Sequence, residues 1–183
     1  MRWLTVPVSA HSGQSINEIF SSSIDWKSRH IDSLYGFYSK SENFKYVWGD
    51  IKELFDTINE SNSISYTNST LIIKISDMLG IQTDFQYSSQ LKTQGVGEDR
   101  LISIVSSISS SGIYLSGVGG KNYQNQESFI NAGLGFEYTN FSHPNYHQWS
   151  SIFQSGLSIL DPIFHLGWKK TSALLGVGFS DKE

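Results

Sequence analysis

Apolar residues between positions 44 and 58 recur with the 3.6-residue period of an amphipathic helix. The members of this run are Phe44, Val47, Trp48, Ile51, Leu54, Phe55 and Ile58. A looser run with the same period predicts a preceding helix, and its members are Trp26, Ile31, Leu34, Phe37 and Tyr38. The polar residues 39–43 predict the break between them. The chain must therefore bury two helix faces in its core.

Segments typical of strands alternate with further helical segments. The strand-like segments, which are rich in β-branched and aromatic residues, are 3–8, 81–87, 113–117 and 135–141. The remaining predicted helices cover 71–79, 99–110, 123–132 and 158–166, and Gly80 and Gly167 end the first and the last of them. This alternation predicts an α/β fold. We expect a mainly parallel sheet flanked by helices on both faces in three layers, with a helical insertion after the first strand, in one domain over residues 1–183.

Composition excludes several classes of function. The chain has no cysteine, so disulfides and thiolate chemistry are excluded. Its net charge is -4 and its 13 basic residues are scattered, which argues against a nucleic-acid partner. The longest apolar stretch is far below the roughly 20 residues that span a bilayer, and the N-terminus does not resemble a signal peptide. We expect a cytoplasmic protein.

A glycine-rich turn follows the predicted strand 113–117. Its residues are Ser116, Gly117, Val118, Gly119 and Gly120. Glycines before a helix let backbone amides approach an anion, so the turn is a candidate substrate-binding loop. It lacks both the Walker A pattern and the GxGxxG pattern of dinucleotide sites. The alternative is a tight strand-to-helix turn without a ligand.

The segment 143–149 combines imidazoles, an amide and aromatic rings, which is typical of a pocket lining. His143 and His147 have the i, i+4 spacing of metal ligands, but Pro144 disfavours a helix there and no HExxH glutamate accompanies them. We therefore predict neither a metal nor a cofactor. A structural role for His143 is the alternative to a catalytic one.

Other candidates lie at the ends of predicted elements. Ser88 and Ser89 follow the strand 81–87, at the edge where open α/β sheets bind ligands. Arg100 offers a planar fork for a phosphate or carboxylate, or pairs with a surface carboxylate. Ser158 is not part of a GxSxG nucleophile elbow, which disfavours a hydrolase. Asp161, in the first turn of the last helix, caps or braces that helix or takes part in catalysis.

Five segments together resemble the WbqC-like protein family of bacteria in their order and spacing. They are 3–8, the helix bearing Trp26 and His30, 114–120 with Tyr123, 143–148 and 157–161. The resemblance implies a place in surface-polysaccharide and O-antigen (lipopolysaccharide) biosynthesis, and transfer of glycine or a similar acyl group to an amino sugar. It supplies motif positions rather than roles: Ser116, Gly117, Gly119, Gly120, Tyr123, His143, Tyr146, Gln148, Ser158 and Asp161.

These observations predict a transferase with a small-molecule substrate, an amino-sugar nucleotide or an acyl donor. His143 is the expected general base, with Asp161 as the second catalytic candidate. The expected substrate-binding residues are Ser88, Ser89, Arg100, Ser116, Gly117, Gly119, Gly120, Tyr123, Tyr146, Gln148 and Ser158. We expect the glycine turn and the segment 143–149 to share one cleft.

The alternative is a non-catalytic ligand-binding or assembly protein of the same pathway. An inactive truncated member is a further possibility, because members of the family usually place another segment before the strand that corresponds to residues 3–8. The sequence predicts no oligomeric state.

Overall fold

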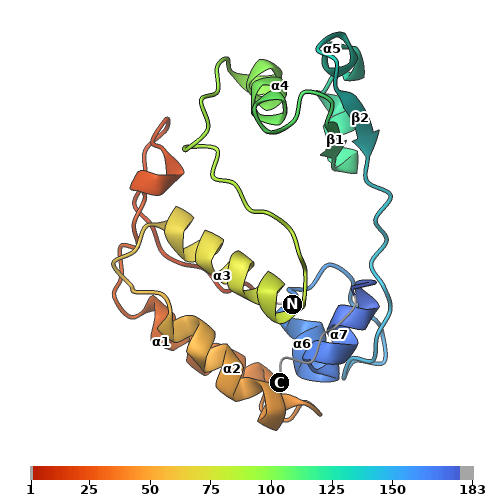
Figure 1. The fold of residues 1–183 in the computed structure, drawn as a ribbon. Coiled ribbons are helices and arrows are strands. Elements are labelled where there is room, and N and C mark those ends of the chain that lie inside the picture. The colour runs from red at the N-terminus through yellow and green to blue at the C-terminus, as the bar shows by residue number, and fades with distance from the viewer. Residues whose placement is uncertain (1, 178–183) are drawn as a thin grey trace. The chain divides into compact units, whose positions relative to one another are not determined.

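The computed structural model describes residues 2–177, which divide into two compact units. Unit 1 contains the chain up to Thr83 and again from His143 onward. Unit 2 is the continuous segment Asp84–Ser142 (Figure 1). Each unit buries a hydrophobic cluster of its own. The prediction of one domain over the whole chain remains a prediction.

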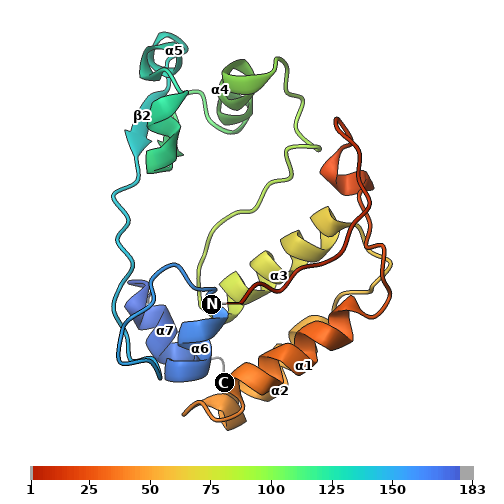
Figure 2. The same cartoon turned by 180° about the vertical axis from the view of Figure 1, so that it is seen from behind.

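Unit 1 is helical. Its elements are the 3-10 helix η1 (Ile16–Glu18) and the helices α1 (Trp26–Tyr38), α2 (Phe44–Asp56), α3 (Ile64–Met78), α6 (Leu160–Leu166) and α7 (Trp168–Leu174). Helix α2 contacts α1, α3 and α6, and α1 and α2 lie side by side in both views (Figures 1 and 2). The central position of α2 follows from its regular apolar face.

The core of unit 1 joins the two ends of the chain. The residues that α2 buries are Val47, Ile51, Leu54 and Phe55, which confirms the face predicted from their period. Ile163 and Phe164 of α6 are completely buried in the same cluster. The Phe164 ring stacks on Tyr38, with centroids 4.4 Å apart and planes 11° apart. Aromatic stacking of this kind adds to the gain from area burial.

Unit 2 is a small α/β arrangement. Its elements are α4 (Gly97–Ile108), β1 (Ile113–Ser116), the 3-10 helix η2 (Val118–Asn122), α5 (Gln126–Asn131) and β2 (Gly135–Tyr138). Strands β1 and β2 pair in parallel, with Ile113 opposite Gly135 and Ser116 opposite Tyr138. The fully buried Phe129 of α5 packs with Phe136 against residues of α4. The predicted strands 113–117 and 135–141 are therefore confirmed, in shorter form.

The predicted strands 3–8 and 81–87 are wrong. Residues 81–87 have no regular structure, and within 3–8 only Val8 forms an isolated antiparallel bridge, to Ser21. Large apolar side chains of both segments are exposed, with Trp3 at 85% and Phe85 at 40%. A strand persists only where its edge is paired and a face is buried. The α/β class and a parallel pair of strands are confirmed, but the three-layer sheet is not.

Two predicted helix ends are confirmed. Gly80, just beyond α3, and Gly167, just beyond α6, have φ angles of 75° and 78°. This is the left-handed region that glycine enters without a steric penalty. Helix α3 begins at Ile64, seven positions before the predicted start at Leu71. Ser63 caps it, because its hydroxyl accepts a hydrogen bond from the Tyr66 amide over 3.2 Å.

Candidate functional site

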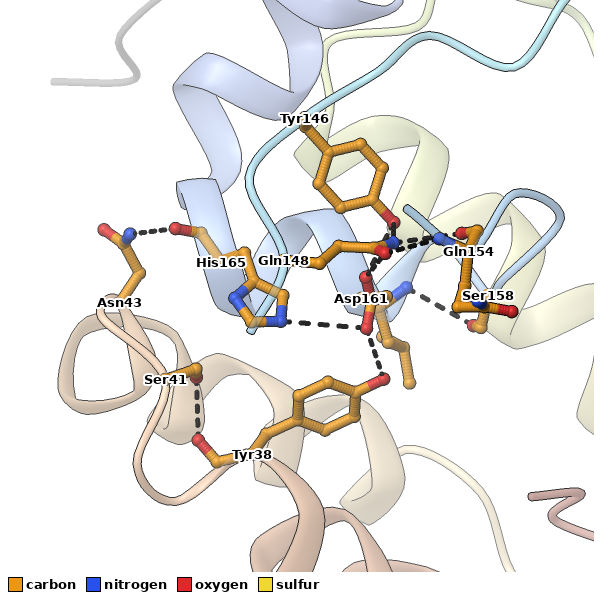
Figure 3. Close-up of polar contacts among 10 residues, drawn as sticks. Tyr38, Ser41, Asn43, Tyr146, Gln148, Gln154, Ser158, Asp161 and His165 are labelled. Carbon is orange, nitrogen blue, oxygen red and sulfur yellow. Dashed lines mark hydrogen bonds and ion pairs between the residues drawn. The ribbon is translucent and has the colours of Figure 1, made fainter. Parts of the chain in front are cut away.

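A buried carboxylate in unit 1 collects hydrogen bonds from distant parts of the sequence. Asp161, the second residue of α6, is 5% exposed. The Tyr38 hydroxyl donates to its Oδ1 over 3.0 Å, and the Tyr146 hydroxyl donates to Oδ2 over 2.6 Å. Gln148 Nε2 also donates to Oδ2, over 3.2 Å (Figure 3). These donors satisfy a charge that would otherwise be costly to bury.

The segment before α6 is held in place by Gln148. Its Oε1 accepts a hydrogen bond from the Gln154 amide over 2.8 Å, and its Nε2 donates to the Gln154 carbonyl over 3.0 Å. Gln148 is 8% exposed although the surrounding residues form no helix or strand. The Gln148 side chain therefore satisfies backbone groups of Gln154 that would be paired within a helix or a sheet.

The turn between α1 and α2 is tied to α6 as well. Asn43 Nδ2 donates to the His165 carbonyl over 2.7 Å (Figure 3). The backbone amide of Asn43 donates to the Phe164 carbonyl over 3.2 Å. Ser41 Oγ donates to the carbonyl of Tyr38 over 2.7 Å. These bonds fix the end of α1, from which Tyr38 reaches Asp161.

His165 lies one helical turn after Asp161 and is 8% exposed. Its Nε2 is 3.9 Å from Asp161 Oδ1 (Figure 3). Burial lowers the pKa of His165 below its usual value, and the Asp161 charge opposes that shift. A neutral imidazole can accept a proton near neutral pH. The rings of Tyr38 and Trp149 meet the imidazole edge-on, at centroid distances of 6.2 and 6.3 Å.

The two phenols that bind Asp161 hold their protons firmly. Burial and the neighbouring Asp161 raise the pKa of Tyr38 far above its usual value. The same two causes raise the pKa of Tyr146. Both hydroxyls are therefore donors over the whole physiological pH range.

Two cavities of unit 1 adjoin this cluster. They have volumes of about 330 and 290 Å³ and share four lining residues, Arg2, Phe37, Tyr38 and Leu157. The first, which we call the polar cavity, is also lined by Gln148, Trp149, Ser150, Gln154, Asp161 and His165. The second, the apolar cavity, is also lined by Trp3, Leu4, Leu34, Gly156, Ser158 and Leu160. Small-molecule sites commonly combine apolar walls with a few convergent polar groups in this way.

The model of the WbqC-like protein family matches residues 1–173. The chain belongs to the WbqC-like protein family. No curated protein matches it, and neither does any solved structure. The match extends over both units. It includes Asp161 and the residues around it, Tyr38, Tyr146, Gln148 and His165.

Several candidates named from the sequence meet in unit 1 of this WbqC-like protein. Gln148 and Asp161 line the polar cavity, and Ser158 lines the apolar one. Tyr146 reaches the site through its bond to Asp161. His143 is exposed and lines neither of these cavities. Its catalytic role stays a prediction.

The candidates of the glycine turn belong to unit 2. Ser116 is 3% exposed and donates hydrogen bonds to Gln124 Oε1 and to the Gly117 carbonyl. Gly120 is buried, and a Cβ placed there would collide with Gln124 and Ser116. Gly119 has open space around it. Ser116 and Gly120 therefore pack the inside of the turn.

The remaining candidates of unit 2 are on its surface. Ser88, Ser89 and Arg100 are exposed, and Tyr123 is 76% exposed. The binding roles of these residues and of the glycine turn stay predictions. A cleft shared with the segment 143–149 also stays a prediction, because the two segments belong to different units.

Residues 2–177 contain neither a metal-ligand cluster nor a membrane-spanning helix. Within that part of the chain, no group of three or more His, Asp or Glu side chains is arranged to hold a metal ion. None of the helices in the same range is long and apolar enough to cross a bilayer.

Sequence reasoning missed the residues that approach the site from outside the motifs. They are Arg2, Tyr38, Gln154 and His165, whereas Trp149 belongs to the segment 143–149 that was predicted to line a pocket. For His165 a signal was readable, since its i, i+4 spacing from Asp161 places both on one face of the predicted last helix. The periodicity of residues 26–38 places Tyr38 in the core, so nothing in the sequence indicates a role for its hydroxyl.

Proposed function

We propose that this WbqC-like protein is a cytoplasmic transferase that moves a glycyl or similar acyl group onto the amine of an amino sugar during bacterial surface-polysaccharide synthesis. Family membership supports the biological setting. The observation that carries the chemistry is that a buried carboxylate, a protonated phenol and a buried imidazole, those of Asp161, Tyr38 and His165, line one cavity. A second phenol, that of Tyr146, binds the same carboxylate. Such a set can both position a substrate and accept a proton.

The reaction needs a proton acceptor for the amine. When the nitrogen attacks the acyl carbon of an activated donor, a C–N bond forms, the donor's leaving group departs, and the nitrogen loses a proton. His165 lines the polar cavity, and its lowered pKa keeps the imidazole neutral. His143 is the alternative base, from the sequence motif. His165 has the stronger support, because it lies at the cavity wall.

Asp161 is a positioning residue in this scheme. Its two oxygens already accept three hydrogen bonds, from Tyr38, Tyr146 and Gln148. The carboxylate holds these groups in place beside the polar cavity. Its charge also raises the pKa of His165, against the lowering that burial causes. Held groups of this kind contribute to catalysis by orientation.

The three hydrogen bonds that the Asp161 carboxylate already accepts also support a second candidate function. A carboxylate whose oxygens are occupied by internal donors braces the fold and needs no catalytic task. This favours a ligand-binding or assembly protein of the same pathway, with the cavities as its ligand site. The two candidates differ in whether product forms.

Amide formation measured by mass spectrometry tests the proposal. Purified wild-type protein is incubated with pairs of an activated glycyl donor and a nucleotide-linked amino sugar. We expect product, and a loss of about 10²- to 10⁴-fold in rate for His165→Asn, the usual contribution of a general base. His11→Asn, at an exposed histidine, is the matched control and should keep full activity.

The outcomes separate the alternatives. If His143→Ala abolishes turnover and His165→Asn does not, the base is His143. If the wild type forms no product with any pair but is stabilised by the amino sugar in a thermal-shift assay, the transferase proposal fails and the ligand-binding function replaces it.

A further inference from the structure

Arg2 stands where the polar and apolar cavities meet. It lines both of them, together with Phe37 and Tyr38. Its guanidinium lies over the Phe37 ring, 5.6 Å from the centroid. Within the described range, residues 2–177, the cations that form ion pairs are Lys27, Arg29 and His165. Arg2 is not among them. The shared wall therefore carries a cation without a carboxylate partner in the described chain.

Charge is distributed unequally between the two cavities. In the apolar cavity Arg2 is the only Lys, Arg, Asp or Glu among the lining residues, and Ser158 supplies a hydroxyl. The polar cavity is lined by Asp161 as well as by Arg2. The Asp161 carboxylate accepts hydrogen bonds from the hydroxyls of Tyr38 and Tyr146. The described lining of the apolar cavity thus offers an anion the Arg2 guanidinium and no carboxylate.

We propose that the two cavities form one bipartite ligand site in which Arg2 binds an anionic group, a phosphate or a carboxylate. The apolar cavity holds the ring or acyl portion of that ligand, and the polar cavity holds its amine or hydroxyl end. The inference rests on the proposed function, because it names the substrate class of the same site: an anionic sugar derivative or an anionic acyl donor.

The chemistry of arginine suits this position. Its planar fork binds phosphate or carboxylate oxygens in pairs, which an ammonium group does not reproduce. The Phe37 ring restrains the guanidinium through a cation–π contact, so less freedom is lost when a ligand binds.

Binding is measured by thermal shift and calorimetry with four probes. Uridine diphosphate and uridine diphosphate N-acetylglucosamine carry phosphates, N-acetylglycine carries a carboxylate, and N-acetylglucosamine is uncharged. We expect at least one anionic probe to bind the wild type, and N-acetylglucosamine to bind more weakly. Which anionic probe binds distinguishes a phosphate ligand from a carboxylate ligand.

Substitutions assign that binding to Arg2. Arg2→Gln should lower the affinity for the anionic probe about tenfold or more, the loss expected for a charge-assisted hydrogen bond. Arg2→Lys should keep only part of that affinity. Arg29→Gln is the matched control, because Arg29 is an exposed arginine of α1 that pairs with Asp25. Arg100→Gln tests the anion site predicted in unit 2. Arg29→Gln should bind the anion within about twofold of the wild type.

Three results would overturn the inference. Arg2→Gln could bind the anions as the wild type does, Arg100→Gln could lose them instead, or no anionic probe could bind the wild type at millimolar concentration. The proposed function fails separately. Anion binding through Arg2 without amide formation leaves the inference standing and removes the transferase, whereas full turnover by Arg2→Gln does the reverse.

Discussion

The Tyr146 hydroxyl donates a 2.6 Å hydrogen bond to Asp161 Oδ2, and this bond anchors the irregular segment before α6 to the first turn of that helix. The other oxygen of the carboxylate receives Tyr38, the last residue of α1. One side chain therefore joins three parts of unit 1. The predictions below test how much the fold and the site depend on such contacts.

Asp161→Asn should destabilise the protein by about 1–3 kcal/mol, the cost of leaving buried polar groups without good partners. The amide offers one acceptor oxygen where two phenols and Gln148 now donate. The free energy of unfolding in urea measures the effect. Asp32→Asn, at an exposed position of α1, is the control and should change it by less than about 0.5 kcal/mol. Equal effects of the two substitutions would show that the cluster adds no stability.

Phe164→Ala should be among the most destabilising substitutions, costing about 3–5 kcal/mol. The ring is completely buried and stacks with Tyr38 and Phe44, so its removal leaves a cavity between α1, α2 and α6. Urea or thermal unfolding measures the loss. Phe20→Ala removes a ring that is 51% exposed and should cost much less. A loss below about 1 kcal/mol for Phe164→Ala would contradict the packing.

Stability should fall as the pH drops below about 6.5, the usual pKa of histidine in an unfolded chain. Burial lowers the pKa of His165 in the folded state, so the unfolded state binds the proton first. The contribution of neutral His165 is complete above pH 6.5 and is lost as the pH falls toward the lowered pKa. His30, whose pKa is also lowered by burial, acts in the same direction.

Urea unfolding at pH 7.5, 6.5 and 5.5 checks this dependence. His165→Gln should flatten the decline, and the exposed His11→Gln serves as the control for loss of an imidazole. A wild-type protein that becomes more stable over this acid range would reverse the sign of the argument.

Gly120→Ala should destabilise unit 2 by about 1–3 kcal/mol, the usual cost of overpacking. The added methyl group would collide with Gln124 and Ser116, which bond to each other inside the turn. Gly119→Ala, one residue earlier, meets open space and should stay within about 0.5 kcal/mol of the wild type. Hydrogen exchange of β1 and β2 amides locates the effect. Equal protection in the two variants would exclude the packing role.

Periodicity predicted α1, α2 and α6 of unit 1, but it placed the start of α3 seven positions too late and did not predict α7. The face of α2 was legible in the sequence, and the left-handed turns at Gly80 and Gly167 followed from the end of the apolar pattern. The prediction of strands 3–8 and 81–87 was wrong because a strand depends on contacts outside its own segment. Residues 3–8 have the composition of a strand, but a strand requires a partner edge, which local sequence does not report.

The candidate site divides in the same way. Tyr146 and Gln148 come from the segment 143–148 and Asp161 from the segment 157–161, two of the segments that carry the family resemblance. The bond from Tyr146 to Asp161 has an |i−j| of only 15. Tyr38 bonds to Asp161 with |i−j| of 123. Such a pairing depends on tertiary packing of α1 against α6, which a pattern within one helix does not encode.

The interleaved order of the two units has a consequence for the nascent chain. Unit 2 is continuous, so all its contacts can form once residue 142 has been synthesised. The first half of unit 1 must wait until α6 emerges to receive Phe164 and Asp161. Until then the apolar surface of α1 and α2 that α6 covers stays exposed on the ribosome, a state in which aggregation competes with folding.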